Sequence, residues 1–288
     1  MVRSALLALL IALPLSAGEV AVTFDDLPAN PAIAPRLLSA IVRAKVPAIG
    51  FVNENKLTSN AHIEVLKAWH AAGLGLGNHT YSHRDLHEIG ADAFTRDVIR
   101  GEEVTTVILG ARPKWFRHPF LHTGKTPEAK QEVEEFLARR GYRIAPVTLD
   151  NSEWIFARAY DLAKNAAARK RIGDAYIVYM DAKLLYFEDQ SRKLFGRDIR
   201  HVLLVHANAL NADWFGALAK SMKKRGYAFV TLERALEDPA YRSADAYTGP
   251  SGITWIHRWA LTAGKKGAFF AGEPKTPQWI QDAAGIRE

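Results

Sequence analysis

The stretch EVAVTFDD, residues 19–26, begins with an apolar run suited to one buried strand and ends in two adjacent carboxylates. Longer segments with helical periodicity follow, and Asn211 is the expected N-cap of one of them. These segments alternate with six further apolar runs, at residues 47–52, 73–78, 113–118, 142–149, 201–206 and 227–232. Alternation of this kind predicts parallel strands joined by crossover helices, in an open doubly wound sheet or a closed barrel.

Two regions do not fit this alternation. Residues 155–199 form a long, charged helical insertion between the fifth and sixth strands, and residues 237–288 extend beyond the last strand. The barrel itself is therefore predicted for residues 19–236, with the C-terminal extension packed on it. No glycine-rich nucleotide-binding motif follows the first strand, so a nucleotide-binding fold is not favoured.

Residues 1–18 have the layout of a secretory signal peptide. Arg3 precedes an apolar run from Ala5 to Leu15, and cleavage is expected near Ala17 or Gly18. The run is too short to span a bilayer comfortably, so no stable membrane insertion is expected after cleavage. A buried N-terminal helix is the alternative. The sequence contains no cysteine and therefore no disulfide framework, and a bacterial periplasmic or secreted protein is predicted.

The charge of the chain is moderately basic. The formal net charge is +7, and removal of residues 1–18, which carry only Arg3, leaves +6. Such an excess favours anionic surroundings such as cell-wall polymers. The short basic clusters ARKRIG (168–173) and KSMKKRG (220–226) are typical of solvated helix ends, so nucleic acid is not an expected partner.

Polar residues gather just after the predicted strand ends, and the C-terminal ends of barrel strands form one mouth. Asp25 and Asp26 point in opposite senses along a strand, so one can bind a metal while the other faces a reacting water. His79 and His83 are four residues apart, which places both imidazoles on one face of a helical turn and suits a divalent cation. The alternatives are aspartates that cap a helix or turn and histidines that only satisfy local hydrogen bonds.

Five ordered motifs resemble those of the polysaccharide deacetylase family, which includes chitin, chitooligosaccharide and peptidoglycan deacetylases. They read TFDD (23–26), HTYSH (79–83), RHPF (117–120), DNSEW (150–154) and LLVH (203–206), and the match covers about residues 19–236. The resemblance implies an α/β fold, a distorted (β/α) barrel with seven parallel strands. It also implies metal-dependent removal of acetyl groups from N-acetylated sugars, which is hydrolysis of the C–N bond of a linear amide.

The resemblance further implies a role for each matching residue. Asp26, His79 and His83 resemble the ligands of one divalent metal ion, with zinc the expected ion. Asp25 resembles the general base, and Arg117 resembles the arginine that orients this aspartate and keeps it ionised. A metal at this place would make water acidic enough to be activated near neutral pH.

The remaining matches concern the leaving amine and the acetyl group. His206 resembles the general acid, and Glu153 stands where the family carries the aspartate that orients this histidine. Phe120 replaces a common tyrosine but keeps the backbone N–H that would bind the oxyanion. Trp154 and Leu203 resemble the walls of the acetyl pocket, although both could be plain core residues.

The predicted function is therefore an exported, metal-dependent deacetylase of an acetylated glycan. The same residues could instead hydrolyse another amide or an acetyl ester, and a catalytically silent saccharide-binding protein is the alternative from a different class. A chitin-like polymer, peptidoglycan, a biofilm exopolysaccharide and a short oligosaccharide are all compatible substrates. Many family members carry aspartate after the last motif, whereas here Asn208 or Asn211 is expected to cap the next helix.

Overall fold

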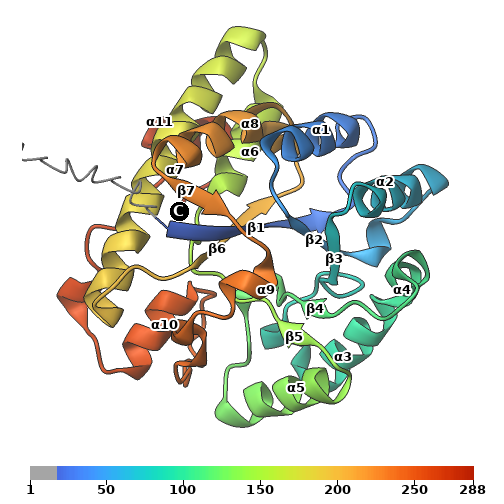
Figure 1. The fold of residues 1–288 in the computed structure, drawn as a ribbon, viewed down its shortest axis with the longest axis vertical. Coiled ribbons are helices and arrows are strands. Elements are labelled where there is room, and N and C mark those ends of the chain that lie inside the picture. The colour runs from blue at the N-terminus through green and yellow to red at the C-terminus, as the bar shows by residue number, and fades with distance from the viewer. Residues whose placement is uncertain (1–17) are drawn as a thin grey trace, which may run out of the picture.

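The computed structural model describes residues 18–288, so the predicted signal peptide, apart from Gly18, lies outside the described residues. Strands alternate with helices along the chain, and the helices surround a curled sheet (Figure 1). Each predicted apolar run contains a strand, though often a shorter one. The strands are β1 (Gly18–Leu27), β2 (Ile49–Val52), β3 (Gly75–Asn78), β4 (Trp115–Phe116), β5 (Arg143–Ile144), β6 (His201–His206) and β7 (Tyr227–Phe229).

The helices connect these strands as the alternation predicted. Around the barrel lie α1 (Ala34–Ala44), α2 (Asn60–Ala71), α3 (Leu86–Arg100), α4 (Glu103–Leu109), α5 (Pro127–Arg139), α8 (Ala209–Lys224) and the short α9 (Leu232–Ala235). Asn208 and Asn211 were both expected as caps of α8. Asn208 is the N-cap, because its side chain accepts a hydrogen bond from the Asn211 N–H. The expectation that Asn211 caps this helix is therefore wrong.

All the strand pairs are parallel, which confirms the predicted fold class. The sheet has the order β5-β4-β3-β2-β1-β6, and β7 pairs with the first three residues of β1. Beyond β5, Leu149 forms an isolated parallel bridge with Leu203 of β6. This bridge brings the two edges of the sheet together, so the sheet is a distorted barrel rather than an open layer.

Alternation along β1 separates the interior of the barrel from its outer surface. Val20, Val22 and Phe24 belong to the large core between the strands and the helices. Ala21 belongs to a small apolar cluster, together with Phe51 and Trp115, that α9 completes through Leu232 and Ala235. This cluster fills the N-terminal end of the barrel, so the polar residues further along the strands lie on an apolar floor.

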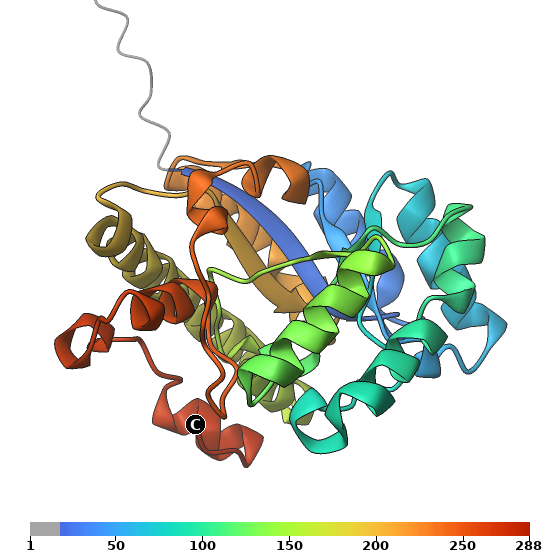
Figure 2. The same ribbon diagram turned by 90° about the horizontal axis from the view of Figure 1, so that it is seen from below.

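The insertion and the extension are both largely helical. The insertion comprises α6 (Glu153–Leu162) and α7 (Ala166–Phe195), and α7 begins at the N-cap Asn165. The extension holds α10 (Trp255–Thr262) and α11 (Gln278–Ala284), and α11 packs against α6. In Figure 2 the strand arrows of β1 and β6 point toward the face on which the red C-terminal segment lies. Within residues 18–288, no helix is both long and apolar enough to cross a membrane.

Candidate active site

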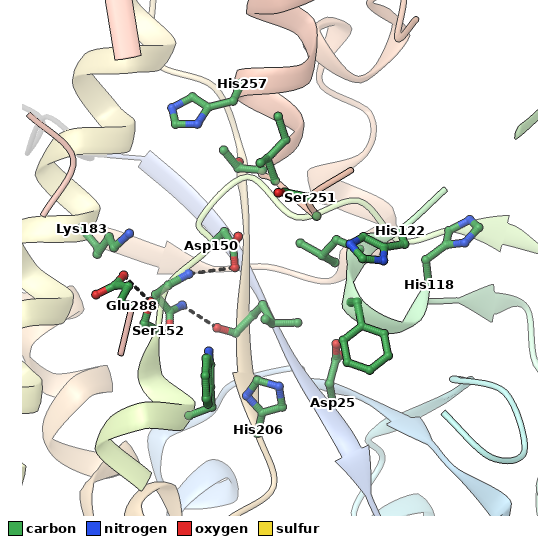
Figure 3. A pocket seen from close by; sticks show the side chains of 18 of the residues that line it. Asp25, His118, His122, Asp150, Ser152, Lys183, His206, Ser251, His257 and Glu288 are labelled. Atoms are coloured by element: carbon green, nitrogen blue, oxygen red, sulfur yellow. Dashed lines mark hydrogen bonds between the residues drawn. The ribbon is translucent and has the colours of Figure 1, made fainter. Parts of the chain in front are cut away.

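The predicted site residues meet where β1, β3 and β6 end. Asp25 and His206 lie side by side because they are register partners in the parallel pair of β1 and β6. Asn78 ends β3 beside Val52 of β2, and the chain then carries His79 into the same region. Figure 3 shows Asp25 and His206 at one end of a shared pocket. The structure thus brings together residues that are up to 181 positions apart in the chain.

Asp26, His79 and His83 direct one donor atom each toward a common point. The Oδ1 atom of Asp26 lies 3.7 Å from His83 Nε2 and 4.0 Å from His79 Nε2, and it accepts no hydrogen bond from the described residues. His79 Nδ1 donates to the backbone carbonyl of Arg117 at 2.8 Å, which leaves the Nε2 lone pair free. An unpaired carboxylate oxygen between two imidazoles is a donor set that suits zinc or a similar divalent ion.

The surroundings favour the metal-binding protonation state of all three groups. Burial lowers the pKa of His79 and of His83 to about 4, so both imidazoles are neutral at pH 7. Burial alone would raise the pKa of Asp26, but the Lys56 ammonium, 3.2 Å from Oδ2, and the charge of His206 hold that pKa well below its usual range. A metal ion therefore needs to displace no proton from this site near neutral pH.

The two candidate histidine ligands are not on a helical turn, and that expectation is wrong. Residues 79–85 contain no helix, and Thr80 and His83 have φ angles of 66° and 55°. Asn78 Oδ1 accepts the Thr80 N–H at 2.7 Å, and Thr80 Oγ1 accepts the His83 N–H at 3.0 Å. These hydrogen bonds hold a strained loop that folds the second imidazole back toward the first.

Asp25 lies beside the candidate metal ligands but is more deeply buried than Asp26. Its Oδ2 atom is 3.7 Å from His79 Nε2 and 3.7 Å from an Nη atom of Arg117, and its Oδ1 atom accepts no hydrogen bond from the described residues. Burial raises the pKa of Asp25, and the Arg117 charge offsets only part of that rise. Arg117, which is fully buried, also donates to Thr23 Oγ1 at 2.8 Å. Asp25 is thus a largely desolvated carboxylate that faces the site, as a general base requires.

His206 forms a hydrogen-bonded pair with Glu153. The distance from His206 Nδ1 to Glu153 Oε2 is 2.9 Å, and the side chains of Asn208 and Asn211 donate to the other carboxylate oxygen. The longer side chain of glutamate therefore still reaches the histidine. Burial alone would lower the pKa of His206, but the hydrogen bond and charge of Glu153, with the charges of Asp26 and Asp25, raise that pKa to about 9.

The residues expected around the acetyl group divide into two sets. Phe120 and Trp154 line the pocket, and each exposes about half of its surface, 52% and 47%. Leu203 does not line the pocket: it is buried in the core, and Leu204 lines the pocket in its place. The reason is the alternation of side chains along β6, which places Leu204 and His206 on one face and Leu203 on the other.

A second cluster of potential metal ligands was not predicted from the sequence. It consists of Asp85, His87 and His122, which lie close together on the wall next to Phe120. The two imidazole rings are stacked, with 4.0 Å between centroids and 7° between planes, so their in-plane lone pairs are parallel and cannot meet at one ion. His122 Nδ1 donates to Asp85 Oδ1 at 2.8 Å. This arrangement is a hydrogen-bonded pair rather than a chelating site.

The C-terminal extension packs directly on the loop that carries Phe120. Arg258 of α10 is fully buried, and its guanidinium contacts the Leu121 carbonyl, Thr123 Oγ1 and the Asp245 carboxylate. Phe120 and Leu121 have φ angles of 57° and 56°, a strained conformation that such contacts can maintain. The extension therefore forms part of the site.

We expect Gly252→Ala to lower the melting temperature by roughly 3–10 °C, because a Cβ atom there would lie 1.7 Å from the Phe120 carbonyl oxygen. The matched control is Gly216→Ala on α8, where a Cβ meets no atom within 4 Å and alanine favours the helix. Thermal unfolding followed by circular dichroism measures both. Equal melting temperatures for the two variants would show that the extension does not press on the Phe120 loop.

Together, the fold and the site define a distorted (β/α) barrel with a candidate Asp/His/His metal site at the C-terminal ends of its strands. The sequence model of the polysaccharide deacetylase family matches residues 13–142 of this chain. This match confirms the resemblance inferred from the motifs over somewhat less than half of the chain.

Known relatives and solved structures agree with this assignment. A peptidoglycan-N-acetylglucosamine deacetylase of Bacillus cereus is 27% identical over 154 residues, which are 53% of this chain and 52% of that protein. The chitin deacetylase structure of Colletotrichum lindemuthianum has a TM-score of 0.56 at 24% identity, over 81% of this chain and 93% of that one. A CE4 family pseudoenzyme of Bacillus anthracis has a TM-score of 0.55 at 15% identity, over 76% and 65%. The chain spans about half the length of the curated relatives it matches, and the structural likenesses show the fold alone.

Proposed function

We propose that the protein is a metal-dependent deacetylase that hydrolyses the acetamide group of an N-acetylated saccharide of the chitin or peptidoglycan type. One observation carries this proposal: the three candidate metal ligands lie beside a buried carboxylate, Asp25, whose partner on the neighbouring strand is a carboxylate-bound histidine, His206. The names of two relatives, a peptidoglycan-N-acetylglucosamine deacetylase and a chitin deacetylase, support the substrate class.

Each side chain has one step in the proposed reaction. Asp26, His79 and His83 would hold a divalent ion, which would supply Lewis acidity to the acetamide carbonyl and to the attacking water. Asp25, oriented by Arg117, takes the proton of the attacking water. The Phe120 N–H, which has no acceptor among the described residues, donates to the oxygen that becomes negatively charged. His206, held by Glu153, donates its proton to the nitrogen as the C–N bond breaks, so the products are acetate and a free amine.

The acetyl methyl group requires an apolar contact surface. We assign this contact to Trp154 and to Leu204, which replaces Leu203 because it lies on the same face of β6 as the proposed acid. The exposed indole offers a flat apolar surface at the pocket.

Two other functions use the same site. Hydrolysis of an acetyl ester or another amide needs the same base and the same Lewis acid. A silent saccharide-binding protein is the alternative from a different class, since a pseudoenzyme shares this fold. Both proton-transfer groups have an orienting partner: Arg117 lies within ion-pair distance of Asp25, and Glu153 is hydrogen-bonded to His206. The presence of both groups favours turnover over binding alone.

Acetate release tests the proposal. The protein, freed of metal and then loaded with zinc, cobalt or manganese, is incubated with N-acetylglucosamine oligosaccharides, peptidoglycan and acetylated xylan. We expect metal-dependent acetate release from the amide substrates. Saccharide binding without acetate release, independent of metal, would instead identify the silent binding protein.

We expect one divalent ion per chain, and we expect His83→Ala to weaken binding of that ion by roughly 100-fold or more, because a third of the donor set is lost. Elemental analysis and calorimetric zinc titration measure the two quantities. His62→Ala, which changes a partly exposed histidine at the start of α2, is the matched control and should bind zinc normally. Unchanged zinc affinity in His83→Ala would refute this ligand set.

We also propose that the protein is exported to the periplasm or secreted, with residues 1–18 as the signal. The net charge of +6 that remains suits a cell-wall environment. N-terminal sequencing of the mature protein tests the cleavage, and recovery of intact Met1 would contradict it.

A further inference from the structure

The pocket that holds Asp25 and His206 continues to a second polar region, most of which lies outside the family motifs. Lys183 of α7, His257 of α10 and Glu273 of the extension line this region. Figure 3 shows Lys183 and His257 on the far side of the pocket from Asp25, with Asp150 between Lys183 and Asp25. The whole cavity measures about 850 Å³. That volume lies near the upper end of the range of roughly 300–1,000 Å³ for sites that bury a whole ligand, and it exceeds the need of one acetylated sugar.

Three charged side chains of this region, Lys183, Glu273 and Glu288, already have polar partners. Lys183 is 5% exposed, and its ammonium lies 2.6 Å from a carboxylate oxygen of Glu273. The Glu288 carboxylate accepts hydrogen bonds from the Ser152 hydroxyl and the Thr276 N–H. Paired charges of this kind do not favour a strongly cationic or anionic ligand, because the ligand would have to replace an existing partner.

Unused hydrogen-bonding capacity remains in the same region. Lys183 has three N–H donors, and Glu273 is its one hydrogen-bond acceptor among the described residues. Asp150 uses one carboxylate oxygen for the Asn151 N–H and lines the pocket. Separate donors and acceptors around a cavity match a neutral group that carries several hydroxyls, since each hydroxyl both donates and accepts.

We propose that Lys183, Glu273 and Asp150 form a second saccharide subsite, which binds the neutral sugar unit adjoining the unit that is deacetylated. This proposal rests on the proposed deacetylase function for the identity of the first unit. It assigns α7 and the C-terminal extension a role in substrate selection: the protein binds an N-acetylated disaccharide more tightly than a monosaccharide.

The Lys183–Glu273 pair also joins the extension to α7, so a purely structural role must be separated from recognition. A structural role would affect every substrate alike, because it would disturb the Phe120 loop that the extension supports. Recognition would affect only ligands that are long enough to reach the second region. The comparison of a long and a short ligand is therefore decisive.

The test measures binding and turnover of the zinc-loaded full chain. The probes are the β-1,4-linked disaccharide of N-acetylglucosamine, the monosaccharide and an aryl acetate. We expect Lys183→Met and the isosteric Glu273→Gln to raise the Kd and KM for the disaccharide about 10-fold or more, since hydrogen bonds to charged groups are lost. The values for the monosaccharide and the aryl acetate should change less than two-fold.

The matched control is Lys170→Met, which removes an exposed pair with Asp174 at the start of the same helix and should leave all values unchanged. Equal losses on the long and short ligands, or an unchanged disaccharide Kd in Glu273→Gln, would overturn the subsite. Calorimetric binding keeps the two proposals separate. Selective loss of disaccharide binding without any acetate release would support the subsite and refute the deacetylase function.

Discussion

We expect Asp25→Asn to reduce amide turnover by roughly 10²–10⁴-fold while zinc binding stays near normal, because an amide cannot accept the proton of the attacking water. The substitution is nearly isosteric, and Asp25 lies 3.7 Å from His79 Nε2 without belonging to the candidate ligand set. Acetate release and elemental analysis of the same preparation measure the two effects.

Stability gives an internal control for this variant. Burial raises the pKa of Asp25 in the folded protein, so ionisation of this carboxyl opposes folding. The stability of the protein therefore falls as the pH rises from the pKa of Asp25 in the unfolded chain through its pKa in the folded protein. At pH 7 the neutral amide removes this cost. The metal-free Asp25→Asn protein should therefore melt at the same temperature as the parent or higher. Asp26→Asn should instead lose zinc. Zinc loss in Asp25→Asn with zinc retained in Asp26→Asn would show that the two aspartates have exchanged roles.

The sequence predicts the barrel well because its signals are local. Each strand is a short apolar run, and each crossover helix has its own periodicity and caps, so the α/β class and the parallel sheet follow from segments read one at a time. The lengths of β4 and β5 do not follow from such local signals. Each strand has only two paired residues, although the apolar run that predicted it is longer. Hydrogen bonding to neighbouring strands decides those limits, and this is a tertiary property.

The site shows the same division between local and tertiary information. The spacing of His79 and His83 indicates a metal pair but not its backbone, since the loop depends on hydrogen bonds from Asn78 and Thr80 at positive φ angles. The position of Leu203 could have been predicted: alternation from His206 already places residue 204, not 203, on the inner face.

The second polar region was beyond sequence-based prediction for a physical reason. Lys183 and Glu273 are 90 positions apart, and neither belongs to a motif. Only the packing of the extension against the insertion brings them to the pocket. A lysine inside a charged helix is normally solvated, so the sequence gives no sign that Lys183 is buried at the pocket.

The pairing of His206 with Glu153 leads to the second large expected effect. His206→Ala should bind zinc normally but slow amide cleavage by roughly 100-fold or more, the usual scale for a lost proton-transfer group. An aryl acetate has a leaving group that needs little protonation, so its hydrolysis should fall much less. Equal losses on the two substrates would indicate a deformed pocket instead of a lost acid.

Glu153→Gln tests the same assignment through the pH dependence. With a pKa of about 9, His206 carries its proton throughout the neutral range, and amide turnover should decline only as the pH rises through 9. Glutamine still accepts the Nδ1–H but removes the negative charge that opposes the effect of burial, so the pKa of His206 should fall to its ordinary value of about 6.5 or below. The alkaline decline of kcat/KM should therefore move down by about two pH units or more for the amide, while the aryl acetate shows no such shift. An amide profile that keeps its decline near pH 9 in Glu153→Gln would mean that a group other than His206 protonates the departing amine.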